Sequence, residues 1–424
     1  MRSPARCGLL VALACVAVGG ATQPVDTAPP PEVHGLQVMP ASESGSLRRA
    51  HRPPPACPEG EEGARFEVEY TGFPSEAETA FQAAVDTWAC RIESPFPIRI
   101  DAKWEELDPV TLGSAGPFLH RNFEGAPGRD VWLPAALADL YAGRDLSPGR
   151  PDIDATFNAG FGGWDLDPFT PPRPGEYDLY TVVLHEIGHG LGLIGGFSVV
   201  DGEGVLDDGE GAEGPFLYDR FSVDLEGRPL LMSPVYPVGS EALGDVLQEA
   251  VAFDGLAVQQ VNQQAAPLYA PSLWVTGGSY SHLDENAFPE GTADGLMTPF
   301  VRPMETIAEP GDVTCAMLAD LGWLLTGDCA ARVGALPGVA GRLLVFPDGP
   351  NPFQSSTRLR VVGPPNVALR ADLFDVSGRR IRQLEVPASG ELVVEGDGLA
   401  AGVVLVRITG EGVRAVLPLV RVEG

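Results

Sequence analysis

Basic residues are scarce in this sequence. Its 424 residues include 28 Lys and Arg against 58 Asp and Glu, which gives a formal net charge of -30 at pH 7. Nucleic acids and anionic membranes are bound by clustered basic side chains, so this balance argues against both as partners. The acidity instead suits solubility or a saline habitat.

Long apolar runs are absent beyond the N-terminus. Two arginines precede an apolar run over residues 8–18, and small residues follow it. This order is typical of a signal peptide spanning residues 1–21, and the run is too short to cross a bilayer stably. We therefore expect a secreted chain with no transmembrane segment. Lipid attachment through Cys15 is a weaker alternative, because Ala12 stands where the lipidation signal usually has leucine.

Cysteine is also rare, with six in the chain, and removal of the signal peptide leaves four. An even number of cysteines in an exported protein predicts two disulfides. Proximity in the sequence favours pairing Cys57 with Cys90 and Cys315 with Cys329. A rival interpretation makes Cys57 a thiolate that caps a metal ion in a latent form, but Cys90 would then lack a partner.

The composition divides the mature chain into four parts. Residues 22–60 are rich in Pro, Ser and Ala, which is typical of a flexible tether or a propeptide. Residues 61–326 mix strand and helix patterns, and residues 327–342 form a linker containing Gly and Pro. Residues 343–424 consist of short β-branched runs separated by turns, which predicts a small all-β sandwich. The predicted fold class is therefore α+β.

Several elements within residues 61–326 can be predicted individually. Alternating side chains indicate strands, and an apparent capping box at Ser75–Glu78 indicates the start of a helix. A second helix begins near Asp178 after turn-rich sequence. The expected strands cover 65–70, 98–100 and 152–158, and the expected helices run from Ser75 to about Arg91 and over residues 180–193.

An acidic, glycine-rich loop covers residues 201–210. Its carboxylates could bind a structural Ca²⁺ ion, because calcium prefers oxygen ligands. The spacing of the carboxylates does not match the loop of a helix-loop-helix calcium site, so we favour a solvated loop.

The second predicted helix contains the sequence His185-Glu186-Ile187-Gly188-His189. Histidines four residues apart lie on one face of a helix, where both can bind one zinc ion. Three protein ligands would leave a coordination position open for water, and Glu186 beside the metal could act as a general base. A chance occurrence of the pattern in an ordinary helix is disfavoured by the apolar flanks and the exported context.

The motif and the glycines after it resemble the zinc-binding signature of the metzincin proteases. In that signature Gly192 would end the helix and a third histidine would follow three residues later, where this chain has Gly195. Of the other histidines, only His282 lies downstream. His282 and the later Leu-Met-Thr-Pro sequence around Met297 resemble the leishmanolysin-type metzincins, in which an insertion precedes the third ligand.

That resemblance implies a metzincin-like domain with a mixed sheet and an active-site helix. It makes His282 the third zinc ligand and Met297 the residue of the Met-turn beneath the metal. Asp284 and Glu285 are alternatives, because a carboxylate can bind zinc or orient His282. A surface role for His282 would leave the site without a downstream histidine.

Residues 343–424 resemble the sorting domain of proteins exported by type IX secretion. The resemblance implies recognition by secretion machinery and a location outside the cell or on its surface after outer-membrane export. An accessory sandwich without a sorting role is the alternative.

Together these features predict a secreted zinc endopeptidase that hydrolyses peptide bonds of protein or peptide substrates with a zinc-activated water and Glu186 as general base. The competing interpretation is a cell-surface binding or adhesion protein whose zinc site is inactive or structural. A fourth protein ligand on the metal would favour the second interpretation.

Overall fold

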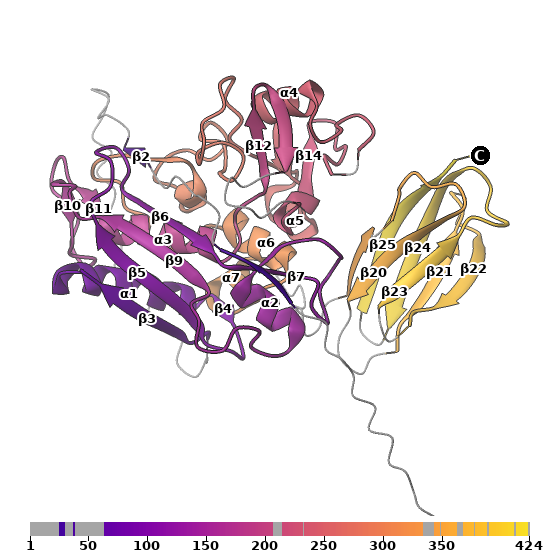
Figure 1. The fold of residues 1–424 in the computed structure, drawn as a ribbon, viewed down its shortest axis with the longest axis horizontal. Helices are drawn as coiled ribbons and strands as arrows, with labels where there is room; N and C mark the ends of the chain where they lie inside the picture. Colours follow the sequence, from indigo (N-terminus) through magenta and orange to yellow (C-terminus); the bar gives the residue numbers. More distant parts are fainter. Residues whose placement is uncertain are drawn as a thin grey trace, which may run out of the picture.

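The fold is that of a computed structural model of the chain (Figure 1). The predicted signal peptide, the lipidation candidate Cys15, Cys57 and residues 207–213 lie outside its described residues. The described residues are 25–29, 37–38, 63–206, 214–231, 233–333, 343–347, 349–362, 368–376, 378–387, 390–410 and 413–422. They mix α-helices with β-strands, as the predicted α+β class requires.

A four-stranded mixed sheet forms the centre of the larger unit, residues 63–333. Its strand order is β3 (Phe66–Thr71), β5 (Ile98–Glu105), β9 (Ile153–Asn158) and β6 (Gly113–Pro117). The first three strands are parallel and β6 runs antiparallel to β9. The strands predicted at 65–70, 98–100 and 152–158 are therefore confirmed, and β6 was not predicted because its sequence is mostly small residues.

Two helices contact each other and this sheet: α1 (Ser75–Ala89) and α3 (Leu179–Gly190). The indole N–H of Trp88 on α1 donates to the carbonyl of Leu184 on α3 at 2.9 Å. Both helices were predicted, but the capping box was wrong. Pro74 occupies the N-cap position, and the Ser75 hydroxyl bonds the side chain of Glu76 instead of capping the helix.

Short elements surround the sheet. Within the expected tether, β1 (Asp26–Ala28) pairs with β7 (Leu119–Arg121), and β2 (Gln37–Val38) pairs with β17 (Phe300–Val301). The remaining short elements before α3 are β4 (Ile92–Glu93), β8 (Leu133–Pro134), α2 (Ala135–Ala142), β10 (Trp164–Asp165) and β11 (Tyr177–Asp178).

The chain after α3 forms a series of short helices and strands. In order these are β12 (Phe197–Val200), β13 (Glu203–Leu206), the 3₁₀ helix η1 (Tyr218–Phe221), β14 (Ser222–Asp224), α4 (Glu241–Glu249), β15 (Val251–Phe253), α5 (Leu256–Asn262), β16 (Ala266–Pro267), the 3₁₀ helix η2 (Ala293–Met297), α6 (Asp312–Leu321), β18 (Leu324–Leu325) and α7 (Gly327–Val333). The first part of the predicted linker is thus the helix α7.

Residues 343–422 form a separate set of strands with a hydrophobic cluster of their own. Two antiparallel sheets share this cluster, which includes Leu359 and Val394 of one sheet and Val406 and Leu419 of the other. The sheets are β19 (Leu344–Pro347), β20 (Ser356–Val362) and β23 (Glu391–Glu395), and β22 (Arg380–Glu385), β21 (Arg370–Phe374), β24 (Gly402–Gly410) and β25 (Val413–Arg421).

Within the described part of the chain, no helix is long and apolar enough to cross a membrane. Cys315 on α6 and Cys329 on α7 form a disulfide with a Cα–Cα distance of 5.4 Å, as predicted from their proximity. Cys90 is buried, and its pairing with Cys57 stays a prediction because Cys57 lies outside the described residues.

Replacing both Cys315 and Cys329 by serine should lower the free energy of unfolding of the larger unit. The bond closes a 14-residue separation, and loops of that size contribute about 3 kcal/mol. Tryptophan fluorescence during urea unfolding measures the change selectively, because all six tryptophans lie between residues 88 and 323. An unfolding curve equal to that of the oxidised wild type would contradict the expectation.

Candidate metal centre

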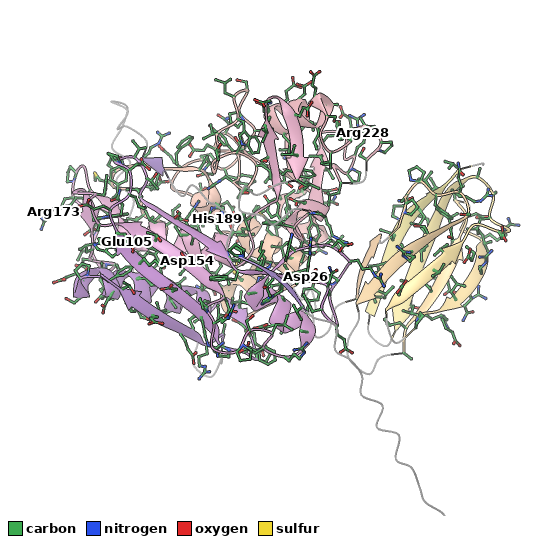
Figure 2. The ribbon with its side chains drawn as sticks, viewed as in Figure 1. Asp26, Glu105, Asp154, Arg173, His189 and Arg228 are labelled. Carbon is green, nitrogen blue, oxygen red and sulfur yellow. A yellow bond between two sulfur atoms is a disulfide. The ribbon has the colours of Figure 1, made fainter. Side chains whose placement is uncertain are left out.

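Helix α3 carries the first two histidines in the interior of the larger unit. All of its residues from Leu179 to Gly190 are buried. Figure 2 shows His189 near the middle of that unit, whereas Arg173 lies at its outer edge. The hydroxyl of Tyr180 bonds Thr87 of α1 at 2.8 Å, so the start of α3 is fixed as well as its middle. A rigid helix therefore presents His185 and His189.

The helix ends where the glycine pattern predicted. Gly192 adopts a φ of +112°, a conformation that side chains disfavour, and the chain turns away there. The indole N–H of Trp323 donates to the carbonyl of Leu191 at 2.8 Å and holds this turn. The turn directs the Leu193 carbonyl back to His189, whose Nδ1 lies 2.7 Å from it.

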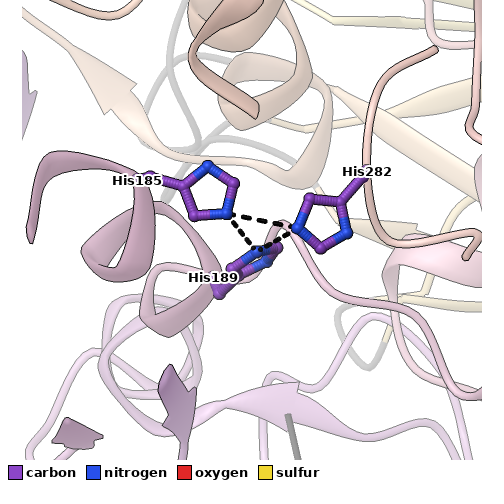
Figure 3. A group of neighbouring side chains, drawn as sticks. All are labelled: His185, His189 and His282. Carbon is purple, nitrogen blue, oxygen red and sulfur yellow. Dashed lines mark hydrogen bonds between the residues drawn. The ribbon is translucent and has the colours of Figure 1, made fainter. Parts of the chain in front are cut away.

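His282 reaches the same place from a segment 93 residues after His189. Backbone hydrogen bonds hold this segment on both sides. The amide of Tyr269 donates to the His282 carbonyl, and the amide of Leu283 donates to the Met297 carbonyl, both at 2.8 Å. The structure therefore brings His185, His189 and His282 together, as the sequence predicted (Figure 3).

The three Nε2 atoms face one another (Figure 3). They lie 3.0 Å apart between His189 and His185, 3.1 Å between His189 and His282, and 3.2 Å between His185 and His282. All three side chains are buried. The cluster therefore offers three ring nitrogens to one point in the interior.

The outer ring nitrogens determine which tautomer is present. Nδ1 of His185 lies 2.6 Å from the Leu296 carbonyl, and Nδ1 of His189 is held by Leu193. A carbonyl oxygen accepts only, so both Nδ1 atoms carry the proton and both Nε2 atoms present lone pairs. Two such lone pairs cannot hydrogen-bond each other. A cation between them removes the repulsion, and this arrangement is the usual one for metal-bound histidine.

The spacing of the nitrogens fits zinc. Zn–N bonds of about 2.0–2.1 Å in a tetrahedral site place ligand nitrogens about 3.3 Å apart. The observed separations of 3.0–3.2 Å are close to that value. Neutral imidazoles are also the ligand set that zinc shares with other first-row metals, so the geometry identifies a possible metal site and not the metal itself.

The ionisation of the three rings suits metal binding. Burial lowers the pKa of His189 to about 4. Burial, followed by the neighbouring imidazoles, holds the pKa values of His185 and His282 well below the usual value. All three rings are thus neutral at pH 7, and a metal ion has no proton to displace.

Glu186 and Met297 complete the predicted set, and both are buried. Glu186 lies on α3 directly after His185. Met297 ends η2 and packs on the helix backbone, since a Cβ added at Gly188 would lie 2.8 Å from its sulfur. Because the neighbouring Leu296 carbonyl holds His185, the same turn supports both the helix and a ring of the cluster.

The two alternative carboxylates have other contacts. Asp284 accepts hydrogen bonds from the amides of Asn286 and Ala287 at 2.9 and 3.1 Å. Glu285 lies 3.9 Å from the guanidinium of Arg302. Among the described residues, the group that could hold a metal consists of the three histidines alone. The acidic loop at residues 201–210 is described only up to residue 206, so the solvated loop that we favoured and the Ca²⁺ site both stay untested.

Sequence reasoning missed two buried polar residues on the segments that adjoin the cluster. Asp219 and Tyr280 are fully buried and hydrogen-bonded to each other beside His282. No motif marks Asp219, whose role depends on contacts between segments far apart in the sequence. The only hint in the sequence was the pair of glycines at 195 and 196, which leave room for the side chains of Asp219 and Tyr280.

No protein-family model matches the chain, and no curated protein matches its sequence.

Replacing His282 by alanine should weaken zinc binding by more than about 100-fold, because losing even a residue that only orients a ligand reduces affinity by about 10–100-fold. Competition with a chromophoric chelator measures the affinity. His120→Ala is the matched control, because His120 is a buried histidine that bonds Ser147 outside the cluster. Equal zinc affinity of the His282 variant and wild type would contradict this assignment.

Proposed function

We propose that this protein is a secreted zinc endopeptidase with a metzincin-like domain at residues 61–326. The observation that carries the proposal is the buried cluster of His185, His189 and His282, with three ring nitrogens directed to one point. Two of the three histidines lie on one helix, with a buried glutamate next to the first of them. That combination of residues is typical of metal-assisted hydrolysis of an amide.

Each residue has a distinct part in the proposed reaction. The three histidines hold the metal through Nε2, and the carbonyls of Leu296 and Leu193 fix the orientation of two of the rings. When bound, zinc would supply Lewis-acid chemistry, polarising a carbonyl and lowering the pKa of water to about 7. Glu186 takes the proton of the attacking water and delivers it to the leaving amine. Met297 supports the site from beneath.

Three ligands favour catalysis over a structural role for the metal. A structural zinc site usually has four protein ligands, whereas a catalytic one keeps a position open. In the described part of the chain, the possible metal-binding group contains three side chains. The competing interpretation, a cell-surface binding protein with a structural zinc site, would need a fourth side chain there.

We further propose that residues 343–424 are a β-sandwich that directs export. The two sheets with a shared core support the sandwich, and the resemblance to type IX sorting domains supports the role in export. Together with the predicted signal peptide, this assigns the mature protein to the exterior or to the cell surface, where protein or peptide substrates are available.

Replacing Glu186 by glutamine should abolish proteolysis while leaving bound zinc unchanged. The change keeps the size of the side chain and removes its ability to accept a proton, and general bases contribute about 10²–10⁴-fold to rate. Hydrolysis of casein by the purified secreted form, with zinc quantified in the same samples, measures both properties. Glu93→Gln, at an exposed position of strand β4, is the control and should retain full activity.

Two outcomes would contradict this assignment. A Glu186→Gln variant that cleaves as fast as wild type would remove Glu186 from the reaction. A wild-type protein that holds zinc but cleaves nothing, both with residues 22–60 present and after their removal, would favour the binding protein. The deletion of residues 22–60 is included because strands β1 and β2 of this segment pair with strands of the larger unit.

Deleting residues 343–424 should block export without affecting the metal site. The C-terminal strands have a hydrophobic cluster separate from that of the larger unit, so the truncated protein should still bind zinc. In a bacterium with type IX secretion, immunoblotting of cells and medium measures export. Recovery of the truncated, zinc-containing protein from the medium at the wild-type level would contradict a sorting role.

A further inference from the structure

Gly195 occupies the position where the metzincin signature has its third histidine, and its surroundings leave no room for a side chain. A Cβ added there would lie 2.1 Å from Cε1 of Tyr280 and 2.7 Å from Oδ1 of Asp219. Both distances are far below van der Waals contact. The ring of Tyr280 and the carboxylate of Asp219 therefore fill the space that a third ligand from this loop would need.

Tyr280 itself is held in an unusual conformation. Its φ is +71°, in the left-handed region that residues with a side chain disfavour, and its side chain is fully buried. The hydroxyl donates to Asp219 Oδ1 at 2.7 Å and also bonds the hydroxyl of Ser222. Such a backbone persists only where the surroundings hold it, and such positions concentrate at functional sites.

Asp219 joins the segment after α3 to the segment that carries His282. Its carboxylate accepts from the amide of Gly196 at 3.0 Å and from the amide of Phe216 at 2.7 Å, in addition to Tyr280. The side chain is completely buried. Asp219 lies 23 positions after Gly196 and 61 positions before Tyr280. One carboxylate therefore connects two segments that are 84 positions apart in the sequence.

A second bond reinforces this connection next to the ligand itself. The amide of Gly195 donates to the hydroxyl of Ser281 at 3.1 Å. The two residues before His282 are thus connected to Gly195 and Gly196. Ser281 bonds Gly195 directly, and Tyr280 is connected to Gly196 through Asp219. Two residues before that pair, the Leu193 carbonyl holds His189. The glycine pair is consequently fixed to one ligand through the backbone and to another through Asp219, Tyr280 and Ser281.

We propose that Asp219 and Tyr280 are positioning residues of the metal centre, which fix His282 against the loop following α3 and thereby set the separation of the three ring nitrogens. The proposal rests on the proposed zinc site. Neither residue is a ligand, and both act through His282. If Asp219 and Tyr280 only stabilised the fold, removing their hydrogen bonds would lower the stability of the protein but leave its metal affinity unchanged.

Tyr280→Phe and Asp219→Asn test this proposal with little change in volume. Tyr280→Phe removes the bond between the two side chains, and Asp219→Asn replaces one of the two accepting oxygens by an NH₂ donor. We expect zinc affinity to fall about 10–100-fold, as for other residues that orient metal ligands. Chelator competition measures the affinity, and the visible absorption of the Co²⁺-loaded protein reports a changed ligand geometry. Urea unfolding in EDTA measures the stability of the metal-free protein.

Matched controls come from equivalent buried bonds elsewhere. Tyr141→Phe removes a hydroxyl that donates to the Leu321 carbonyl, and Asp320→Asn alters a carboxylate that accepts from the amides of Ala257 and Val258. These controls should lower the stability of the metal-free protein while leaving zinc affinity and the Co²⁺ spectrum unchanged. Should Asp219→Asn fail to fold, Tyr280→Phe and Ser222→Ala still test the same connection.

The outcomes separate this proposal from the one on which it rests. Wild-type zinc affinity and an unchanged Co²⁺ spectrum in Tyr280→Phe would overturn the positioning role and leave the zinc site intact. A wild-type protein that binds no zinc would overturn both. Weakened zinc binding and an altered spectrum, at a loss of stability no greater than that of Tyr141→Phe, are the expected result.

Discussion

Three buried imidazoles direct their Nε2 atoms at one point, and the geometry of the proposed metal site depends on that constraint. The carbonyls of Leu296 and Leu193 fix the protons on the outer nitrogens of His185 and His189. The Nε2 atoms of these two rings, 3.0 Å apart, then have no proton to share. Burying two such groups without a partner is unfavourable, and a cation bound at the centre of the cluster would remove that cost.

The architecture assembles this cluster from two directions. Helix α3 is fixed by α1, by the sheet and by the indole of Trp323, so two ligands sit on a rigid element. The third ligand, His282, lies on an irregular segment, which needs additional hydrogen bonds to be held in position. Asp219, Tyr280 and the turn of Met297 supply them. Catalysis by Glu186, as proposed here, would depend on the same rigidity because it lies next to His185.

The sequence predicted the parts of the site that local patterns encode. The spacing of His185 and His189, the end of the helix at Gly192 and three strands of the sheet follow from helical and alternating periodicity. His282 was inferred from a resemblance and from the scarcity of histidine. Asp219 and Tyr280 could not be predicted, because their roles arise from contacts across 61 positions. The capping box failed because Pro74, which precedes Ser75, occupies the N-cap position.

X-ray absorption at the zinc edge of the purified protein, loaded with one equivalent of zinc, tests whether three histidines hold the metal in an open site. We expect three imidazole nitrogens and one oxygen from water, all at about 2.0–2.1 Å. We also expect that the His282→Ala protein loses one imidazole from the shell. A contribution from sulfur near 2.3 Å, or a shell closed by four protein ligands, would contradict an open three-histidine site.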